Sequence, residues 1–338
     1  MIIAKTPFRI SFFGGGTDFP DFFTKFSGNV LSTSIDKYCY VTIRHLSNFF
    51  DYKNEIIYSK IEQVKNVSDI NHPMVKNTLK FFDVNNIRVT YDADLPARSG
   101  LGSSSSFAVG LVHALAHFKN IDLSKKQFAD IAIHIEKEMC MEDGGIQDQI
   151  AASFGGLNLL NFKSEVNTKN SFNIKSYDYE VNSLDIKKEK KEMLENNLML
   201  FFTGISRNAF EIQKETQKLI DKNIENLHIM NDMVKEAADI LKTDKDIDLF
   251  GELLNETWKI KKSLHKSISN NYVDELYDAG IKNGAIGGKL LGAGGGGFIL
   301  FYVRRDKKEN LRSVFKDLIE VPIKFENKGT NIIYKSED

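Results

Sequence analysis

The sequence predicts an α+β protein with two domains, and three observations support this fold class. The chain has 338 residues, which suits two ordinary domains better than one. Apolar and polar residues alternate through much of the first forty positions, as is typical of strands. Strand-like and helix-like segments then mix along the chain without a repeat of fixed period, which favours α+β over an all-parallel sheet.

The N-terminal half is expected to contain several strands followed by two helices. The strands are expected at 2–5, 9–13, 30–35, 38–46 and 87–95. A helix over 104–117 has apolar residues around nearly its whole circumference, which indicates burial. The next helix begins at Ser124, and Gln127 three positions later completes a capping box. Its apolar stripe runs from Phe128 to Met139.

A polar stretch over 163–192 is expected to mark a domain boundary or a solvated excursion within a sheet. We therefore divide the chain into an N-terminal domain, 1–190, and a C-terminal domain, 191–338. The elements expected in the second domain are a strand at 198–202, a long helix over 208–241, a strand at 298–303, a helix over 306–319 and a strand at 321–325.

Composition argues against several classes of function. The net charge is -1, and Lys and Arg form only local runs, so no nucleic-acid partner is expected. No apolar run approaches the roughly 18 residues of a membrane span, and the N-terminus lacks the apolar core of a secretory signal. The two cysteines, Cys39 and Cys140, fit a reducing compartment and lack metal-binding spacing. We expect a soluble cytoplasmic protein.

The stretch PARSGLGSSSS at 96–106 is a candidate phosphate cradle. A helix N-terminus offers unpaired N–H groups, and glycines before it let the backbone approach a phosphate. The lysine of G-x-x-x-x-G-K-[ST] is absent, and a serine-capped strand-to-helix turn explains the loop equally well, so the loop alone leaves both interpretations open. The candidate ATP-binding residues are Pro96, Ser99, Gly100, Leu101, Gly102, Ser103, Ser104, Ser105 and Ser106.

Two other patterns carry less information. KLLGAGGGG at 289–297 leads into G-x-G-x-x-G at Gly292, Gly294 and Gly297, but a strand follows it, whereas a dinucleotide fingerprint opens a helix. A dehydrogenase would rest on this pattern alone. His113 and His117 have zinc-ligand spacing without the glutamate of H-E-x-x-H, so packed or surface histidines are expected.

Three stretches together resemble the GHMP small-molecule kinases, which include galactokinase, homoserine kinase and mevalonate kinase. They are KTPFRISFFGGGTD at 5–18, the cradle at 96–106 and the glycine cluster at 289–297, with GGIQDQIAASFGG between the second and third. The resemblance covers nearly the whole chain. It implies a ribosomal S5 domain 2-like N-terminal domain, a ferredoxin-like C-terminal domain, an active site in the cleft between them, and phosphoryl transfer from ATP with Mg²⁺.

The resemblance also implies roles for single residues. Asp148 takes the place of the catalytic carboxylate and would accept the proton of the attacking hydroxyl. Without the resemblance, the same residue would be interpreted as a helix cap. Arg9 matches the basic residue of the first motif, and its guanidinium near Asp148 would keep that carboxylate ionised and stabilise developing negative charge. Glu136 would bind magnesium together with Ser104. A glycine loop formed by Gly292, Gly294, Gly295 and Gly296 would support the cradle from the opposite domain.

The first motif bears on the substrate. Galactokinase-like members carry Gly-Glu-His-Thr-Asp where this chain has GGGTD at 14–18, so the pocket is expected to be roomier and less negative, which suits a larger or phosphorylated sugar. Asp18 could instead cap a short helix near Pro20. The candidate substrate-binding residues are Gly15, Gly16, Thr17, Asp18 and Gln147, with Arg98, Arg207 or Lys289 as the partner of a sugar phosphate.

Within the family, GGGTDFPDFF and GGIQDQIAASFGGLN most resemble the D-glycero-D-manno-heptose 7-phosphate kinases. That resemblance implies phosphorylation of the anomeric hydroxyl to a 1,7-bisphosphate, a step toward GDP-heptose. Two alternatives stay open: a kinase for an unphosphorylated sugar such as fucose or galactose, and a non-catalytic sugar or nucleotide sensor. A homodimer is compatible with the sequence.

Overall fold

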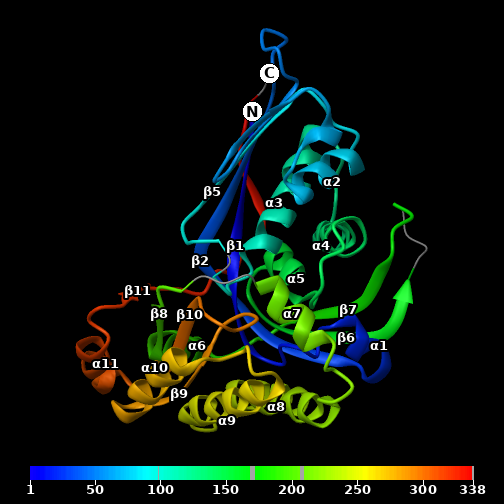
Figure 1. Cartoon of the computed structure of the whole chain (residues 1–338). Helices are drawn as coiled ribbons and strands as arrows, with labels where there is room; N and C mark the ends of the chain where they lie inside the picture. The colour runs from blue at the N-terminus through cyan, green and yellow to red at the C-terminus, as the bar shows by residue number, and fades with distance from the viewer. Residues whose placement is uncertain (98, 168–171, 206–208, 337–338) are drawn as a thin grey trace.

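The protein consists of two sheets, each covered by helices, stacked one above the other (Figure 1). The computed structural model describes residues 1–97, 99–167, 172–205 and 209–336. The first sheet has the strand order β12-β1-β2-β5-β3-β4, and β6 continues from β2 to β7. The second sheet has the order β11-β8-β10-β9. The mixed α+β class predicted from the sequence is confirmed.

The first sheet and its helices contain the elements β1 (Ile2–Phe13), α1 (Pro20–Phe26), β2 (Gly28–His45), β3 (Asn54–Ile57), β4 (Ile61–Val64), a 3₁₀ turn (Val67–Asp69), α2 (Pro73–Phe81), β5 (Ile87–Ala93), α3 (Ser103–Phe118), α4 (Lys125–His134), a π-helical turn (Ile135–Met139), α5 (Gln147–Phe154), β6 (Leu157–Asn167), β7 (Ser176–Ser183) and β12 (Asn331–Lys335).

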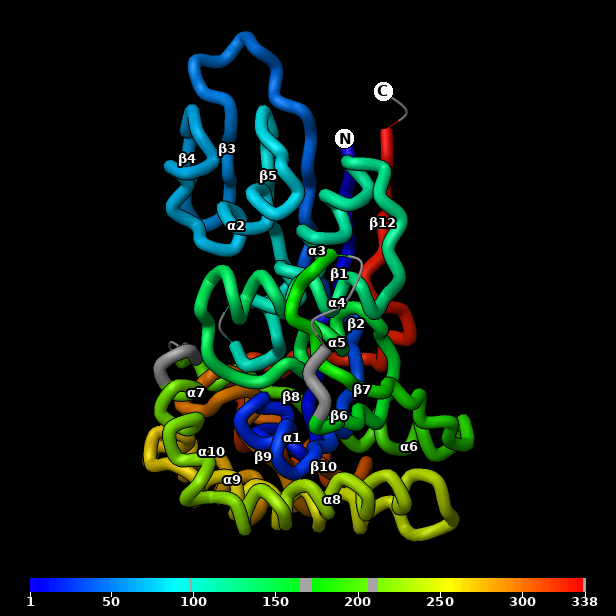
Figure 2. The backbone as a smooth tube through the Cα atoms, turned by 90° about the vertical axis from the view of Figure 1, so that its right-hand side faces the viewer, coloured from blue at the N-terminus to red at the C-terminus, as the bar shows by residue number. Residues whose placement is uncertain are grey.

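The second part contains α6 (Lys188–Asn197), β8 (Leu198–Phe202), α7 (Ala209–Gln217), α8 (Ile224–Lys242), α9 (Asp248–Leu264), α10 (Asn271–Lys282), β9 (Ala285–Leu290), β10 (Phe298–Val303), a 3₁₀ turn (Arg305–Lys307), α11 (Lys308–Val314) and β11 (Ile319–Glu320). The long helices α8 and α9 run side by side along the bottom of the molecule (Figures 1 and 2); α9 packs mainly on β9, and α8 packs on β1 and β2 of the first sheet.

β1 links the two halves of the molecule because its side chains alternate between two environments. Phe8, Ile10 and Phe12 enter an apolar core shared with α8, α9, β8 and β10. The ring of Phe12 packs edge-on against that of Phe250 on α9, with 5.3 Å between ring centroids. Arg9, one position away along the strand, lines a cavity at the junction instead. The central strand therefore both joins the sheets and supplies the site.

Helix α3 is buried almost throughout, as its apolar circumference predicts. Gly110 allows it to approach β1, because a Cβ at that position would lie 2.8 Å from Thr6 Oγ1. The capping box predicted at the start of the next helix is also present: Ser124 and Gln127 bond each other's backbone N–H groups at the start of α4. Both helices pack on the same face of the first sheet (Figure 1).

Several predicted boundaries are wrong. Segments 2–5 and 9–13 are one strand, β1, and 30–35 and 38–46 are one strand, β2. The helix expected over 208–241 is divided into α7 and α8, and at the break the Asn223 amide donates to the Leu264 carbonyl at the end of α9. The polar stretch 163–192 contains β7, which pairs with β6, so the interpretation as an excursion within a sheet is confirmed there.

The C-terminal segments also differ from expectation. The helix expected over 306–319 begins as a 3₁₀ turn and ends at Val314. The segment 321–325 is not a strand: the N–H groups of Lys324 and Phe325 donate to the carboxylates of Asp36 and Glu195, and Phe325 forms only an isolated bridge with Ile35. The strands divide between the sheets near the predicted boundary at 190, except β12, which returns to pair with β1. The domain limits stay a prediction.

Candidate active site

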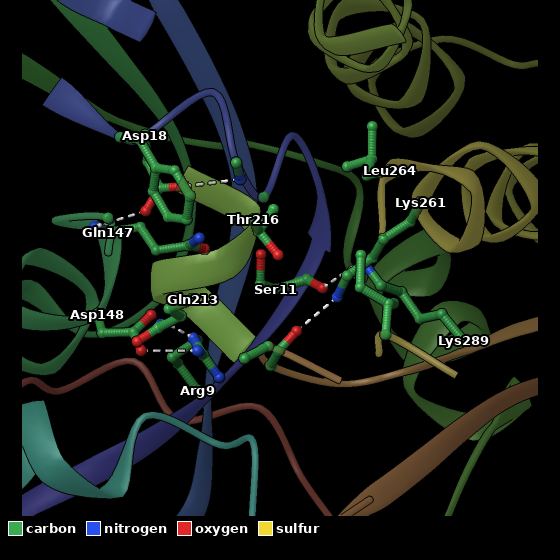
Figure 3. A pocket seen from close by; sticks show the side chains of 17 residues that line it. Arg9, Ser11, Asp18, Gln147, Asp148, Gln213, Thr216, Lys261, Leu264 and Lys289 are labelled. Atoms are coloured by element: carbon green, nitrogen blue, oxygen red, sulfur yellow. Dashed lines mark hydrogen bonds and ion pairs between the residues drawn. The ribbon is translucent and has the colours of Figure 1, made fainter. Parts of the chain in front are cut away.

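An ion pair between Arg9 and Asp148 forms the centre of the site (Figure 3). Arg9 Nε donates to Asp148 Oδ1 and Arg9 Nη2 to Asp148 Oδ2, both at 2.7 Å. The remaining guanidinium nitrogen, Nη1, donates to the Gly100 carbonyl at 2.7 Å, so the side chain has one fixed orientation. Arg9 is buried, whereas the Asp148 side chain is 20% exposed. The pairing predicted for these two residues is therefore present, with the carboxylate accessible from the cavity.

Asp148 is positioned by the first turn of α5, and Asp18 holds that turn in place. Asp18 Oδ2 accepts from the Gln147 N–H at 3.2 Å and Asp18 Oδ1 from the Gly16 N–H at 2.9 Å. Gly145 is required here, because a Cβ would lie 1.7 Å from Asp18 Oδ2. Burial raises the pKa of Asp18, and the nearby Asp148 carboxylate acts in the same direction. The suggested cap of the helix at Pro20 is wrong, since α1 has no side-chain cap.

The serine loop leads into the buried helix α3, close to this ion pair. A Cβ at Gly102, the residue before the helix, would lie 3.3 Å from both Arg9 Cγ and Asp148 Oδ2. The serines are not equivalent: Ser106 donates to the Pro7 carbonyl, Ser105 to Glu136, and Ser104 is exposed. The positive end of the α3 dipole therefore lies beside the carboxylate, and the N–H groups there could also attract a phosphate.

The glycine cluster after β9 packs directly against this loop. Gly292, with φ +71°, approaches so closely that a Cβ would lie 2.4 Å from Gly100 Cα. Gly297 is equally close to Ser99, whose carbonyl accepts from the Phe298 N–H at 3.2 Å. The two loops come from different sheets. The contact predicted between the glycine cluster and the cradle is therefore present, and it requires residues without side chains.

Glu136 is a buried carboxylate without a salt bridge to any described residue. Burial raises its pKa to about 7, with repulsion from Glu142 as the next cause. The Ser105 hydroxyl donates to it at 3.1 Å, and the Gln149 amide also bonds it. In the structure Ser105, on the inward face of α3, contacts Glu136, whereas Ser104 is exposed; the joint role of Ser104 and Glu136 at a magnesium ion stays a prediction.

The donor set at Glu136 fits a magnesium ion bound mainly by phosphates and water. Mg²⁺ typically uses one or two carboxylates, and a cation would offset the buried negative charge. Ser105 lies in the first turn of α3 and bonds Glu136, so both residues supply oxygens close to the N-terminus of that helix. No group of three or more His, Cys, Asp or Glu side chains that would hold a metal on its own occurs among the residues described.

A cavity opens at the Arg9–Asp148 pair and extends between the two halves of the molecule (Figure 3). None of the described cradle residues borders it, so the carboxylate separates this cavity from the start of α3. The residues that line it are Arg9, Ser11, Gly15, Gly16, Asp18, Phe19, Gly145, Gln147, Asp148, Gln213, Thr216, Lys261, Leu264, Ile268, Lys289, Gly292 and Ala293. The lining combines charged and polar side chains with apolar ones such as Phe19, Leu264 and Ile268, as is usual for the site of a small molecule.

The predicted substrate residues divide into three groups. Gly15, Gly16, Asp18, Gln147 and Lys289 border the cavity. Thr17 does not, because its buried hydroxyl donates to the Gly14 and Asn29 carbonyls and so fixes the loop. Arg98 and Arg207 lie outside the described residues.

Lys261 was missed by sequence reasoning, as were Gln213 and Thr216 on α7. Lys261 stands in the run KIKK, which reads as a solvated face. The available signal was its spacing on α9, where it follows Leu254 and Trp258 and precedes Leu264 on the buried face. A lysine in an apolar stripe is uncommon without a polar partner. By contrast, His113 is packed as expected, with Nδ1 3.0 Å from Thr330 Oγ1.

Comparison with known proteins gives consistent matches. The model of the N-terminal domain of GHMP kinases matches residues 70–156, and that of the C-terminal domain matches residues 233–320. A D-glycero-alpha-D-manno-heptose 7-phosphate kinase of Campylobacter jejuni is 33% identical over 92% of this chain and 91% of its own. A bifunctional fucokinase/GDP-fucose pyrophosphorylase of Arabidopsis thaliana is 26% identical over 96% of this chain and 32% of its own.

Solved structures agree on the fold. A D-glycero-D-manno-heptose 1-phosphate kinase from Bacteroides thetaiotaomicron superposes with a TM-score of 0.79 over 100% of both chains, at 24% identity. Its name and that of the Campylobacter protein place the phosphate differently. Within the part of the chain described here, no helix is long and apolar enough to cross a membrane.

Proposed function

Because this chain belongs to the GHMP kinase family and is a small-molecule sugar kinase, we propose that it transfers the γ-phosphate of ATP to the anomeric hydroxyl of D-glycero-D-manno-heptose 7-phosphate. The product is the 1,7-bisphosphate. The choice of this sugar follows the name of the relative that is 33% identical along nearly the full length of both chains. The observation that carries the proposal is Asp148, fixed by Arg9 between the start of α3 and the cavity.

Asp148 is the general base in this proposal. Its carboxylate borders the cavity, so a hydroxyl of a bound sugar would lie within reach, and it would take the hydroxyl proton as the oxygen attacks phosphorus. Arg9 keeps both oxygens of the carboxylate in one orientation and adds a positive charge where the transferring phosphoryl group carries negative charge.

The nucleotide would lie on the other side of Asp148, along the cradle. The N–H groups at the start of α3 and the exposed hydroxyl of Ser104 face the phosphates in this arrangement. A magnesium ion at this site would neutralise negative charge on the phosphates. Glu136 and Ser105 would hold it, and the contact between Gly292 and Gly100 keeps the cradle in shape.

Phosphorus NMR tests the proposal. The protein is incubated with Mg-ATP and the heptose 7-phosphate, and a second phosphate ester at the anomeric carbon is the expected product. The Asp148→Asn variant serves as the matched blank. ADP release without a bisphosphate signal would contradict the assigned acceptor position.

A second candidate is a kinase for an unphosphorylated sugar. It is favoured by the similarity to the fucokinase-containing Arabidopsis protein and by the carboxylate of Asp18 in the cavity wall, which suits sugar hydroxyls. Turnover of fucose or galactose, with none of the heptose 7-phosphate, would select it.

A further inference from the structure

Two lysines in the cavity wall have no part in the phosphoryl transfer proposed above. Lys261 comes from α9 and Lys289 from β9, and both are almost fully buried. Lys261 Nζ donates to the Gly292 carbonyl at 2.5 Å, and Lys289 Nζ to the Ser11 and Phe12 carbonyls at 3.0 and 2.7 Å. Neither lysine forms an ion pair with a carboxylate in the part of the chain that the structure describes.

These amines are close enough to influence one another. Burial lowers the pKa of Lys261 to about 8, and the positive charge of Arg9 adds to the effect, while Asp18 opposes it. Burial also lowers the pKa of Lys289 well below its ordinary value, with repulsion from Lys261 and Arg9 as further causes. Asp148 is already paired with Arg9. The lysine end of the cavity therefore holds two buried amines beside a guanidinium, and neither amine has a paired carboxylate among the described residues.

The same end of the cavity holds unused donors. An ammonium has three N–H groups, and Lys261 directs one to a carbonyl while Lys289 directs two. The Ser11 hydroxyl, between the lysines and Arg9, is buried without a hydrogen-bond partner among the described atoms (Figure 3). Buried polar groups are ordinarily bonded, so an unpaired hydroxyl beside spare ammonium donors indicates a place for a ligand oxygen.

The lysines lie across the cavity from the base. Figure 3 shows Asp148 and Arg9 on one side and Lys261 and Lys289 on the other. A sugar that presents its reacting hydroxyl to Asp148 therefore extends its far end toward the lysines. A phosphate at that far end would supply the missing negative charge and accept from several donors.

We propose that Lys261, Lys289 and Ser11 form the binding site for the non-transferred phosphate of a sugar-phosphate acceptor, and so select phosphorylated over free sugars. The proposal rests on the sugar-kinase function proposed above and adds the residues that set its specificity. Neither the cradle nor the Arg9–Asp148 pair is part of this subsite.

The test compares Lys261→Met with the wild-type protein. Methionine keeps the unbranched apolar stem of the side chain but removes the amine and its charge. The Michaelis constant for the sugar phosphate should rise about 10–100-fold, the expected loss for charge-assisted hydrogen bonds, while that for ATP stays within twofold. The preference for heptose 7-phosphate over free heptose should shrink by the same factor. Lys289→Met should act in the same direction.

Lys262→Met is the matched control, because the neighbouring lysine pairs with Asp274 and does not border the cavity. Its kinetic constants should match the wild type. Without any phosphate present, Lys261→Met should melt no lower than the wild type, since it removes an uncompensated buried charge. A variant that misfolds fails this check, and Ser11→Ala then gives a second measure, with an expected severalfold loss of sugar-phosphate affinity.

A measurement of phosphate binding tests the subsite independently of the sugar-kinase activity proposed above. Inorganic phosphate should raise the melting temperature of the ADP-bound wild type and have a smaller effect on ADP-bound Lys261→Met. This outcome would hold even if the heptose 7-phosphate were not turned over, in which case only the acceptor identity fails. An unchanged sugar-phosphate constant, or a rise in the ATP constant instead, would overturn the subsite.

Discussion

Replacing Asp148 with Asn separates the chemical role of this residue from its structural role. The variant removes the proton acceptor but keeps nearly the same shape. Loss of a general base typically lowers the rate about 10²–10⁴-fold. ATP affinity should change little, because the cradle is built from other residues.

The structure also gives the effect on stability. Removing one partner of a buried ion pair costs about 3–5 kcal/mol. The Asp148 side chain is 20% exposed, and Asn keeps one of the two oxygens that Arg9 contacts at 2.7 Å. The expected loss is therefore nearer to one charge-assisted hydrogen bond, about 1–3 kcal/mol.

Steady-state ADP release and chemical denaturation measure the two effects. Asp130→Asn is the matched control, since Asp130 is a half-buried aspartate that contacts Lys126 and Tyr179 away from the cavity. It should retain the wild-type turnover number. A folded Asp148→Asn protein with a turnover number within a few-fold of wild type would refute the reasoning.

Three further predictions concern the loops, the metal and pH. Gly292→Ala should raise the Michaelis constant for ATP at least tenfold and lower stability, because its Cβ would clash with Gly100. Gly204→Ala is the control: its φ of +76° is similar but the space around it is open, so it should lose only the backbone strain of about 1–2 kcal/mol. Equal effects of the two substitutions would contradict the loop contact. Glu136→Gln should raise the Mg²⁺ concentration that gives half-maximal activity about tenfold or more, without destabilising the metal-free protein. The control, Glu138→Gln at an exposed position, should leave the Mg²⁺ titration curve unchanged. Burial lowers the pKa of His113 to about 4, so the unfolded chain binds the proton first as pH falls, and the free energy of unfolding should decline between pH ~6.5 and ~4 by up to about 3 kcal/mol. In urea titrations at the two ends of this range, His113→Gln should show a smaller decline in the free energy of unfolding than the wild type. The control, His45→Gln at an exposed position, should show the same decline as the wild type. Parallel pH curves for the wild type and His113→Gln would exclude His113 as the cause.

The features predicted best from the sequence are those that depend only on residues close together along the chain. Spacing alone predicts a turn at the glycines before α3 and a helix that begins near its serines, and the capping box at Ser124 is likewise a local feature. The proximity of Arg9 to Asp148 came from the family resemblance, because 139 positions separate the two residues.

Tertiary contacts explain the rest. The choice between Ser104 and Ser105 depends on the rotation of α3 about its axis, which packing against its neighbours fixes. The burial of Lys261 depends on α9 lying across the glycine loop, to which its amine is bonded. The sequence suggested that Thr17 binds a sugar, but in the folded loop its hydroxyl donates to backbone carbonyls instead.

The pairing of β12 with β1 has a consequence for biosynthesis. Ile2 lies opposite Lys335, so one edge of the first sheet is completed only by a segment that is synthesised long after β1. Until then the nascent chain exposes an unpaired strand edge, which favours association with other chains. A fragment cut at residue 320 would keep every catalytic group named above and still present that open edge, so we expect it to aggregate rather than work as a shorter enzyme.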